Sequence, residues 1–189
     1  MSVVANVLCA QASWIACDGR ASRNGEIVSE STDKAVMIND LVCIGYTGTL
    51  ELADLIVLNL REHVIGISDM KSDTVAEAIE FLLPKLNAPE GVCADFLITG
   101  VNSNGVMASY TLGSRSKLSA HIPHDKDLET VVLCSNANKL QLDAYVIKHI
   151  RKSGFSNISI KNALQEYIGD VSEMDISVNR CCQFLELRT

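Results

Sequence analysis

The sequence predicts an α+β fold: a four-layer αββα sandwich, in which two stacked antiparallel sheets lie between two pairs of helices. The first observation behind this prediction is the order of elements, which runs strands, two helices, strands, two helices and a final strand. The second is that the predicted strands are almost continuously apolar, so both faces of each sheet need cover. The third is that 189 residues with only three prolines and no Gly/Ser-rich run contain no linker, which predicts one domain over 1–189.

The chain opens with predicted β-structure. β-branched and small apolar residues dominate 3–9 and 13–18, and Gln11-Ala12 lies between these runs, which predicts a hairpin. Three further strands are expected at 26–29, 35–38 and 41–46.

Two helices are predicted to follow these strands. Apolar residues recur at steps of three and four, as an amphipathic helix requires, and Thr74-x-x-Glu77 matches a capping box before the second helix. The two apolar stripes are Leu50, Ala53, Val57, Leu60 and Val64, and then Val75, Ile79, Leu82 and Leu86.

The second half of the chain repeats this order. Strands are expected at 93–101, 106–112, 117–121 and 131–135, with the turn sequence Asn102-Ser103-Asn104-Gly105 between the first two. Apolar periodicity predicts a third helix over about 140–150 that ends near Gly154, a fourth over about 160–171, and a last strand over 177–187.

Composition narrows the function classes. A net charge of −7 argues against nucleic acid and anionic membranes as partners. The sequence contains no run of eighteen apolar residues, so we expect no membrane-spanning helix. Seven cysteines, an odd number without regular spacing, favour reduced thiols and a cytoplasmic location. The sequence contains no Walker loop, G-x-G-x-x-G or H-E-x-x-H, and no cysteine stands at metal-ligand spacing from a histidine, so we expect neither cofactor nor metal.

Three residues at equal steps of sixteen, Ser2, Asp18 and Lys34, suggest a catalytic group. If Met1 is removed, Ser2 carries both a hydroxyl and a free α-amine, whose ordinary pKa of about 7.7–8.0 suits a general base. Lys34 could supply a cation that favours the ionised hydroxyl and the neutral amine, and Asp18 could hold and balance Lys34. Each of the three, taken alone, is also compatible with a surface residue.

The surrounding sequence resembles the first third of proteasome β subunits, and more closely the bacterial proteasome-like peptidase HslV. The similar stretches are Trp14 to Ser22, Asp33 to Ile38, and Asn39 to Thr49 with its Gly45-Tyr46-Thr47-Gly48 turn. In that family an N-terminal threonine is followed by Asp-Gly or Asp-Ser and then by a lysine, and both spacings match here without a gap. The resemblance covers 2–49 strongly and the remainder in outline, and it implies the N-terminal nucleophile hydrolase fold.

The resemblance also implies roles for further residues. Gly45 matches the glycine whose N–H binds the oxyanion, where a missing Cβ allows close approach. Ser135 matches the serine of a Gly-Ser-Gly near the terminal amine, although Cys134 and Asn136 replace the glycines. Asp175 and Ser177 correspond to residues that orient the same amine. Residues near Ala21, Thr32 and Val36 are candidates for the walls of the substrate pocket.

The predicted function is that of a self-compartmentalised peptidase that uses Ser2 as nucleophile on a peptide or protein substrate. The family implies a homo-oligomeric ring and, in some members, an ATP-dependent unfoldase as partner. Two alternatives remain open at this point: an amidase or acylase of the same fold that acts on a small amide, and a catalytically silent ring-forming subunit. Serine lacks the methyl group with which the family's threonine helps to fix the rotamer of its hydroxyl. This departure from the family is the reason for retaining both alternatives.

Overall fold

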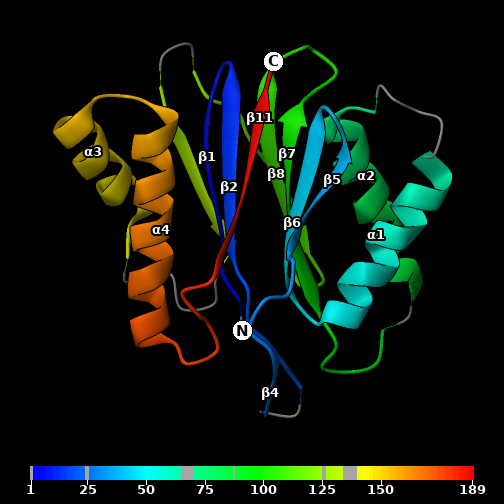
Figure 1. Ribbon diagram of the computed structural model, residues 1–189. Coiled ribbons are helices and arrows are strands. Elements are labelled where there is room, and N and C mark those ends of the chain that lie inside the picture. Colours follow the sequence, from blue (N-terminus) through cyan, green and yellow to red (C-terminus); the bar gives the residue numbers. More distant parts are fainter. Residues whose placement is uncertain (1, 24–25, 65–69, 87, 125–126, 134–139) are drawn as a thin grey trace.

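Two sheets lie face to face between two helix pairs in the computed structural model (Figure 1). The structure describes residues 2–189 except 24–25, 65–69, 87, 125–126 and 134–139. Helices α3 and α4 cover one outer face and α1 and α2 cover the other, so the layers are those of the predicted αββα sandwich.

The first sheet has the strand order β10-β1-β2-β11. β1 and β2 form the predicted hairpin, in which Cys9 pairs with Ala12, and every pairing in this sheet is antiparallel. Helices α3 and α4 pack on its outer face. The bounds are β1 Val4–Cys9, β2 Ala12–Asp18, β10 Glu129–Leu133, β11 Cys182–Arg188, α3 Leu142–Ser153 and α4 Asn157–Met174.

The second sheet is a five-stranded antiparallel meander in the order β5-β6-β7-β8-β9. A separate two-stranded hairpin, β3–β4, extends beyond the end of the sheets at which the N-terminus lies (Figure 1). The bounds are β3 Ala21–Arg23, β4 Glu26–Ser29, β5 Ala35–Asn39, β6 Val42–Gly48, β7 Ala94–Val101, β8 Met107–Gly113, β9 Ser116–His121, α1 Leu50–Val64, α2 Ser72–Leu82 and the 3₁₀ turn Leu83–Leu86.

The core has three apolar layers, one between the sheets and one beneath each helix pair. Side chains alternate between faces of a strand, so β5 places Ala35 in the layer between the sheets and Val36 in the layer beneath α1 and α2. The layer between the sheets also contains a fully satisfied polar cluster. In it, Ser109 Oγ lies 2.7 Å from Asn6 Oδ1 and 2.8 Å from Thr99 Oγ1.

The order of elements confirms the predicted fold, while two local predictions were wrong and one short strand was missed. Helix α2 begins one turn earlier than the capping-box motif indicated, because Lys71 is its N-cap and Thr74 lies inside the helix. The last strand begins at Cys182 because the preceding residues form a turn after α4. β3 has only three residues and was not predicted. None of the helices described is long and apolar enough to span a membrane.

Candidate active site

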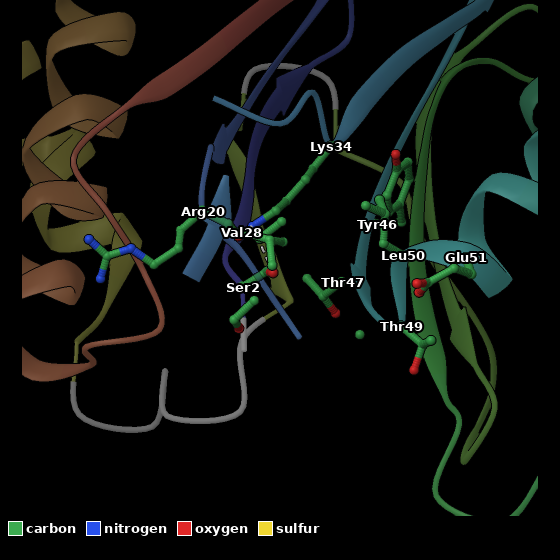
Figure 2. Close-up of a pocket in the computed structure, with 12 residues that line it drawn as sticks. Ser2, Arg20, Val28, Lys34, Tyr46, Thr47, Thr49, Leu50 and Glu51 are labelled. Carbon is green, nitrogen blue, oxygen red and sulfur yellow. Dashed lines mark hydrogen bonds between the residues drawn. The ribbon is translucent and has the colours of Figure 1, made fainter. Parts of the chain in front are cut away.

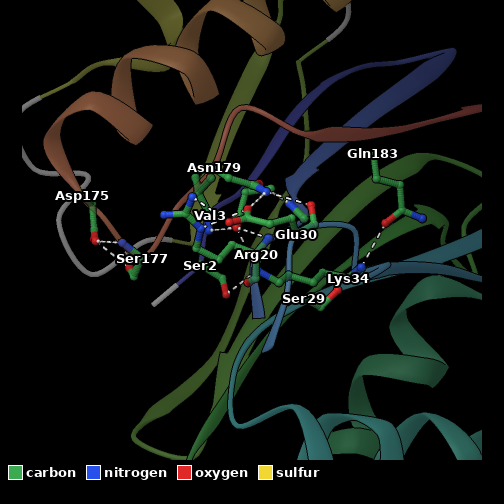
Figure 3. Close-up of polar contacts among 12 residues, drawn as sticks. Ser2, Val3, Arg20, Ser29, Glu30, Lys34, Asp175, Ser177, Asn179 and Gln183 are labelled. Atoms are coloured by element: carbon green, nitrogen blue, oxygen red, sulfur yellow. Dashed lines mark hydrogen bonds and ion pairs between the residues drawn. The ribbon is translucent and has the colours of Figure 1, made fainter. Parts of the chain in front are cut away.

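Ser2, Asp18 and Lys34 meet at the end of the sheets where the N-terminus lies. Lys34 Nζ lies 2.8 Å from Ser2 Oγ and 2.9 Å from Asp18 Oδ2, and it also donates to the backbone oxygen of Arg20. The hairpin β1–β2 places Ser2 beside Asp18, and β5 brings Lys34 to them from the second sheet. The predicted triplet is therefore one hydrogen-bonded group that joins the two sheets, and Figure 3 labels Ser2 and Lys34 of this group.

This group is almost fully removed from solvent. Ser2 is 9% exposed, Lys34 4% and Asp18 0%. The Asp18 carboxylate also accepts the backbone N–H of Val3 at 2.8 Å through Oδ1 and that of Arg20 at 3.0 Å through Oδ2. A buried ion pair needs such additional hydrogen bonds to offset the desolvation of its two charges. The ion pair with Asp18 thus holds Lys34 Nζ directly on the hydroxyl of Ser2.

A cavity of about 370 Å³ opens beside Ser2 and Lys34 (Figure 2). Its walls come from the loop after β2, the β3–β4 hairpin, the end of β6 and the first turn of α1. The lining residues are Ser2, Arg20, Ala21, Ser22, Val28, Lys34, Tyr46, Thr47, Gly48, Thr49, Leu50 and Glu51.

Gly45 does not fit the predicted role of oxyanion donor. It lies buried in the middle of β6, paired with Ala35 on one side and Leu97 on the other, and it does not line the cavity. A Cβ at Gly45 would lie 2.7 Å from a methyl group of Val4 and 2.8 Å from one of Ile15. This glycine is required for close packing between the two sheets rather than for contact with a substrate.

Gly48 is the glycine at the cavity. Tyr46 N donates to Lys34 O at 3.0 Å, and N–H groups two residues apart on a strand point to the same side. The N–H of Gly48 is therefore directed past the start of β5, toward the side on which Lys34 and Ser2 lie. Gly48 has a φ of 95°, and a Cβ there would lie 2.4 Å from Cys93 O, so a side chain is excluded. The Gly-x-x-Gly motif thus lies at the end of β6 beside the cavity, and its second glycine, Gly48, faces Lys34 and Ser2.

Of the three residues predicted near the substrate pocket, one lies at the cavity and two do not. Ala21 lines the cavity, whereas Thr32 and Val36 are not among the lining residues. The N–H of Thr32 donates to Gly19 O at 2.8 Å, which ties the loop before β5 to the end of β2. Val36 packs into the core beneath α1 and α2, because it follows Ala35 on a strand whose alternate side chains face opposite layers.

Asp175 and Ser177 lie in the turn after α4 and bind each other. Asp175 Oδ1 accepts the N–H of Ser177 at 2.9 Å and its hydroxyl at 2.5 Å (Figure 3). Their predicted role at the amine of Ser2 stays a prediction. Ser135 lies outside the described residues.

A polar clamp around the loop after β2 was not predicted. Arg20 pairs with Glu30 at 3.0 Å, and Asn179 accepts the N–H of Gly19 at 2.9 Å while it donates to Glu30 O at 2.8 Å. Hydrogen bonds from Arg20 and Asn179 lower the pKa of the Glu30 carboxyl. The clamp fixes the loop that carries the Arg20 carbonyl onto Lys34. No local pattern could reveal it, because Asn179 is 160 residues from Gly19 in sequence.

Within the part of the chain that the structure describes, no three His, Cys, Asp or Glu side chains gather closely enough to hold a metal ion. The six cysteines described are free thiols.

Comparison with known proteins bears on the fold. The structure is similar to that of the eukaryotic HslV from Trypanosoma brucei, with a TM-score of 0.68 over 99% of each chain. The chain has the fold of HslV. Sequence identity to that protein is only 12%, so the similarity lies in the arrangement of the elements. No protein-family model matches the sequence, and the search of curated proteins found no match to it.

Proposed function

We propose that this chain is a proteasome-like N-terminal nucleophile hydrolase that cleaves peptide bonds with Ser2 as nucleophile. The observation that supports this most strongly is the 2.8 Å hydrogen bond from Lys34 Nζ to Ser2 Oγ, inside a buried ion pair and at the wall of a cavity. A buried lysine that needed only a counterion would be satisfied by Asp18. Its placement on a hydroxyl that faces the cavity suits the activation of a nucleophile.

The proposed reaction begins with removal of Met1, which gives Ser2 a free α-amine. Ser2 Oγ attacks the carbonyl carbon of the substrate, and its proton passes to the α-amine directly or through one water. The tetrahedral intermediate collapses when the protonated amine gives this proton to the leaving nitrogen, which leaves an acyl ester on Oγ. A water molecule, deprotonated by the same amine, then hydrolyses the ester and regenerates Ser2.

The charges of the site suit these steps. The Lys34 cation stabilises negative charge that develops on Oγ and disfavours a second positive charge on the α-amine, so the amine stays available as a base. Asp18 keeps Lys34 in place and balances its charge. We assign the oxyanion to the N–H of Gly48 instead of Gly45, since Gly48 lies at the cavity. Removal of one oxyanion donor typically costs about 10²–10³-fold in rate.

The proposal extends to assembly and location as well. HslV-like architecture supports a homo-oligomeric ring with its sites facing a chamber, an ATP-dependent unfoldase as partner, and a place in the cytoplasm. The sites would take peptides or unfolded protein. In this proposal Ala21 contributes to the wall beside the scissile bond, and Asp175, Ser177 and Ser135 act around the α-amine.

Covalent labelling tests the proposal. A peptide vinyl sulfone should alkylate Ser2 Oγ, with the adduct located by tandem mass spectrometry, and Ser2→Ala should abolish the adduct. Lys34→Ala should slow labelling at least tenfold, whereas Ser119→Ala, which removes an exposed hydroxyl on β9, should leave the rate unchanged. Labelling indifferent to Lys34 would contradict the mechanism.

Two further measurements separate the alternatives. Turnover of small amides without cleavage of peptides would favour the amidase, and wild-type protein that resists the probe would favour the silent subunit. Light scattering that finds a monomer under all conditions would remove the ring.

A further inference from the structure

Gln183 connects the two sheets at the point where Lys34 enters its strand. Gln183 lies on β11, an edge strand of the first sheet, and its side chain reaches β5, an edge strand of the second (Figure 3). Gln183 Oε1 accepts the N–H groups of Lys34 and Ala35, each at 3.0 Å, and Gln183 Nε2 donates to Ala35 O at 2.7 Å. One side chain thus makes three hydrogen bonds to two consecutive residues.

The amide of Gln183 acts on Ala35 as the backbone of a neighbouring strand would. An edge strand presents N–H and C=O groups that lack a strand partner, and Ala35 directs both of its groups away from β6. A primary amide supplies the matching acceptor and donor together. A carboxylate could accept both N–H groups but would set its second oxygen against Ala35 O.

These contacts hold the backbone of Lys34 from both sides. Its C=O accepts the N–H of Tyr46 from β6, and its N–H donates to Gln183 from β11. The other end of the side chain is bound to Ser2 and Asp18, which belong to the first sheet. The position of Nζ on Ser2 Oγ therefore depends on how far apart the two sheets stand at Lys34, and Gln183 is a direct contact that sets this separation.

We propose that Gln183 is a positioning residue, which holds Lys34 so that Nζ stays on the hydroxyl of Ser2. The role in catalysis rests on the function proposed above, whereas the contact itself does not. Gln183 touches neither substrate nor nucleophile and acts only through Lys34.

The test uses two variants of Gln183 and a matched control for each. Gln183→Met keeps the length of the side chain and removes all three hydrogen bonds, and Gln183→Glu keeps the acceptor and removes the donor. Gln165 is exposed on α4, so Gln165→Met and Gln165→Glu make the same chemical changes away from the site. Circular dichroism and urea unfolding identify the variants that fold.

Two readouts are measured on the full chain. Amide hydrogen exchange of Lys34 and Ala35 reports the contact without any need for activity. Exchange should become at least tenfold faster in Gln183→Met and stay unchanged in both Gln165 variants. The rate of Ser2 labelling by the peptide vinyl sulfone, measured against pH, reports the positioning. It should fall about 10- to 100-fold in Gln183→Met, the scale of a small misplacement of a catalytic group.

The shape of the pH profile separates positioning from general damage. If the Lys34 cation moves away from Ser2, the α-amine holds its proton to higher pH, so the pH of half-maximal labelling should rise in Gln183→Met, a change that introduces no new charge. Unchanged exchange at Lys34 and Ala35 would overturn the contact, and a uniform loss of rate without a shift of the profile would overturn the positioning role. A wild-type chain that is never labelled would overturn the proposed function, and the exchange rates would still decide the contact.

Discussion

Removal of the Lys34 cation should destabilise the protein far more than removal of an ordinary lysine. In Lys34→Met the carboxylate of Asp18, with no exposed surface, would lose the ammonium that lies 2.9 Å from it. Loss of one partner from a buried ion pair costs about 3–5 kcal/mol, because the remaining charge stays buried without compensation. The backbone N–H groups of Val3 and Arg20 still bind Asp18, which places the expected loss near the lower end, about 3 kcal/mol.

Urea unfolding measures this loss. With a slope of about 2 kcal/mol per molar urea, 3 kcal/mol lowers the midpoint by about 1.5 M. Lys117→Met, at an exposed position on β9, should change stability by less than about 0.5 kcal/mol. In the double variant Asp18→Asn/Lys34→Met no charge remains buried, so part of the loss should be recovered; the part that remains comes from the N–H of Val3 or Arg20, one of which loses its acceptor in asparagine. A loss below about 1 kcal/mol for Lys34→Met, or a double variant no more stable than the single one, would refute the buried pair.

Three further predictions concern single sites. Gly45→Ala should lower stability by about 1–3 kcal/mol through overpacking against Val4 and Ile15. It should reduce the labelling rate per folded molecule less than Gly48→Ala does, and the opposite pattern would return the oxyanion role to Gly45. Burial raises the pKa of the Cys43 thiol to about 12, so at pH 8 this thiol should stay neutral and resist a thiol reagent in the native state. The exposed thiol of Cys181 should react under the same conditions. Rapid modification of Cys43 in the native protein would contradict its burial. Ser109→Ala should lower the free energy of unfolding by about 1–3 kcal/mol, because the buried Asn6 Oδ1 loses its hydrogen-bond donor. The rate of Ser2 labelling should not change. A loss below about 0.5 kcal/mol in urea unfolding would count against the polar cluster of Asn6, Thr99 and Ser109.

The sequence predicted the parts of the fold that depend on local pattern. Helix periodicity and the runs of β-branched residues placed α1, α4 and the β1–β2 hairpin, because these signals lie within a few residues of each other. The equal spacing of Ser2, Asp18 and Lys34 predicted that these residues act together, and they form one hydrogen-bonded group because all three lie in the first strands and the loops that flank them.

The remaining features depend on contacts between residues that lie far apart in the sequence. Gly45 and Gly48 differ in their surroundings because of the pairing of β6 with β5 and β7, and a pattern of two glycines does not give the direction of their N–H groups. Gln183 is 149 residues from Lys34, and Asn179 is 160 from Gly19, so both contacts follow only from the way the last strand returns beside β2. β3 was missed because three residues are too few for a strand signal.

The most direct test of the central claim is mass spectrometry of the native protein before and after treatment with the peptide vinyl sulfone. The proposed mechanism predicts an untreated chain that lacks Met1, and a treated chain with one adduct, located on Ser2 and absent from Ser2→Ala. Met1 present on every chain, or an adduct that persists at another residue in Ser2→Ala while Ser2 stays unmodified in the wild type, would contradict it.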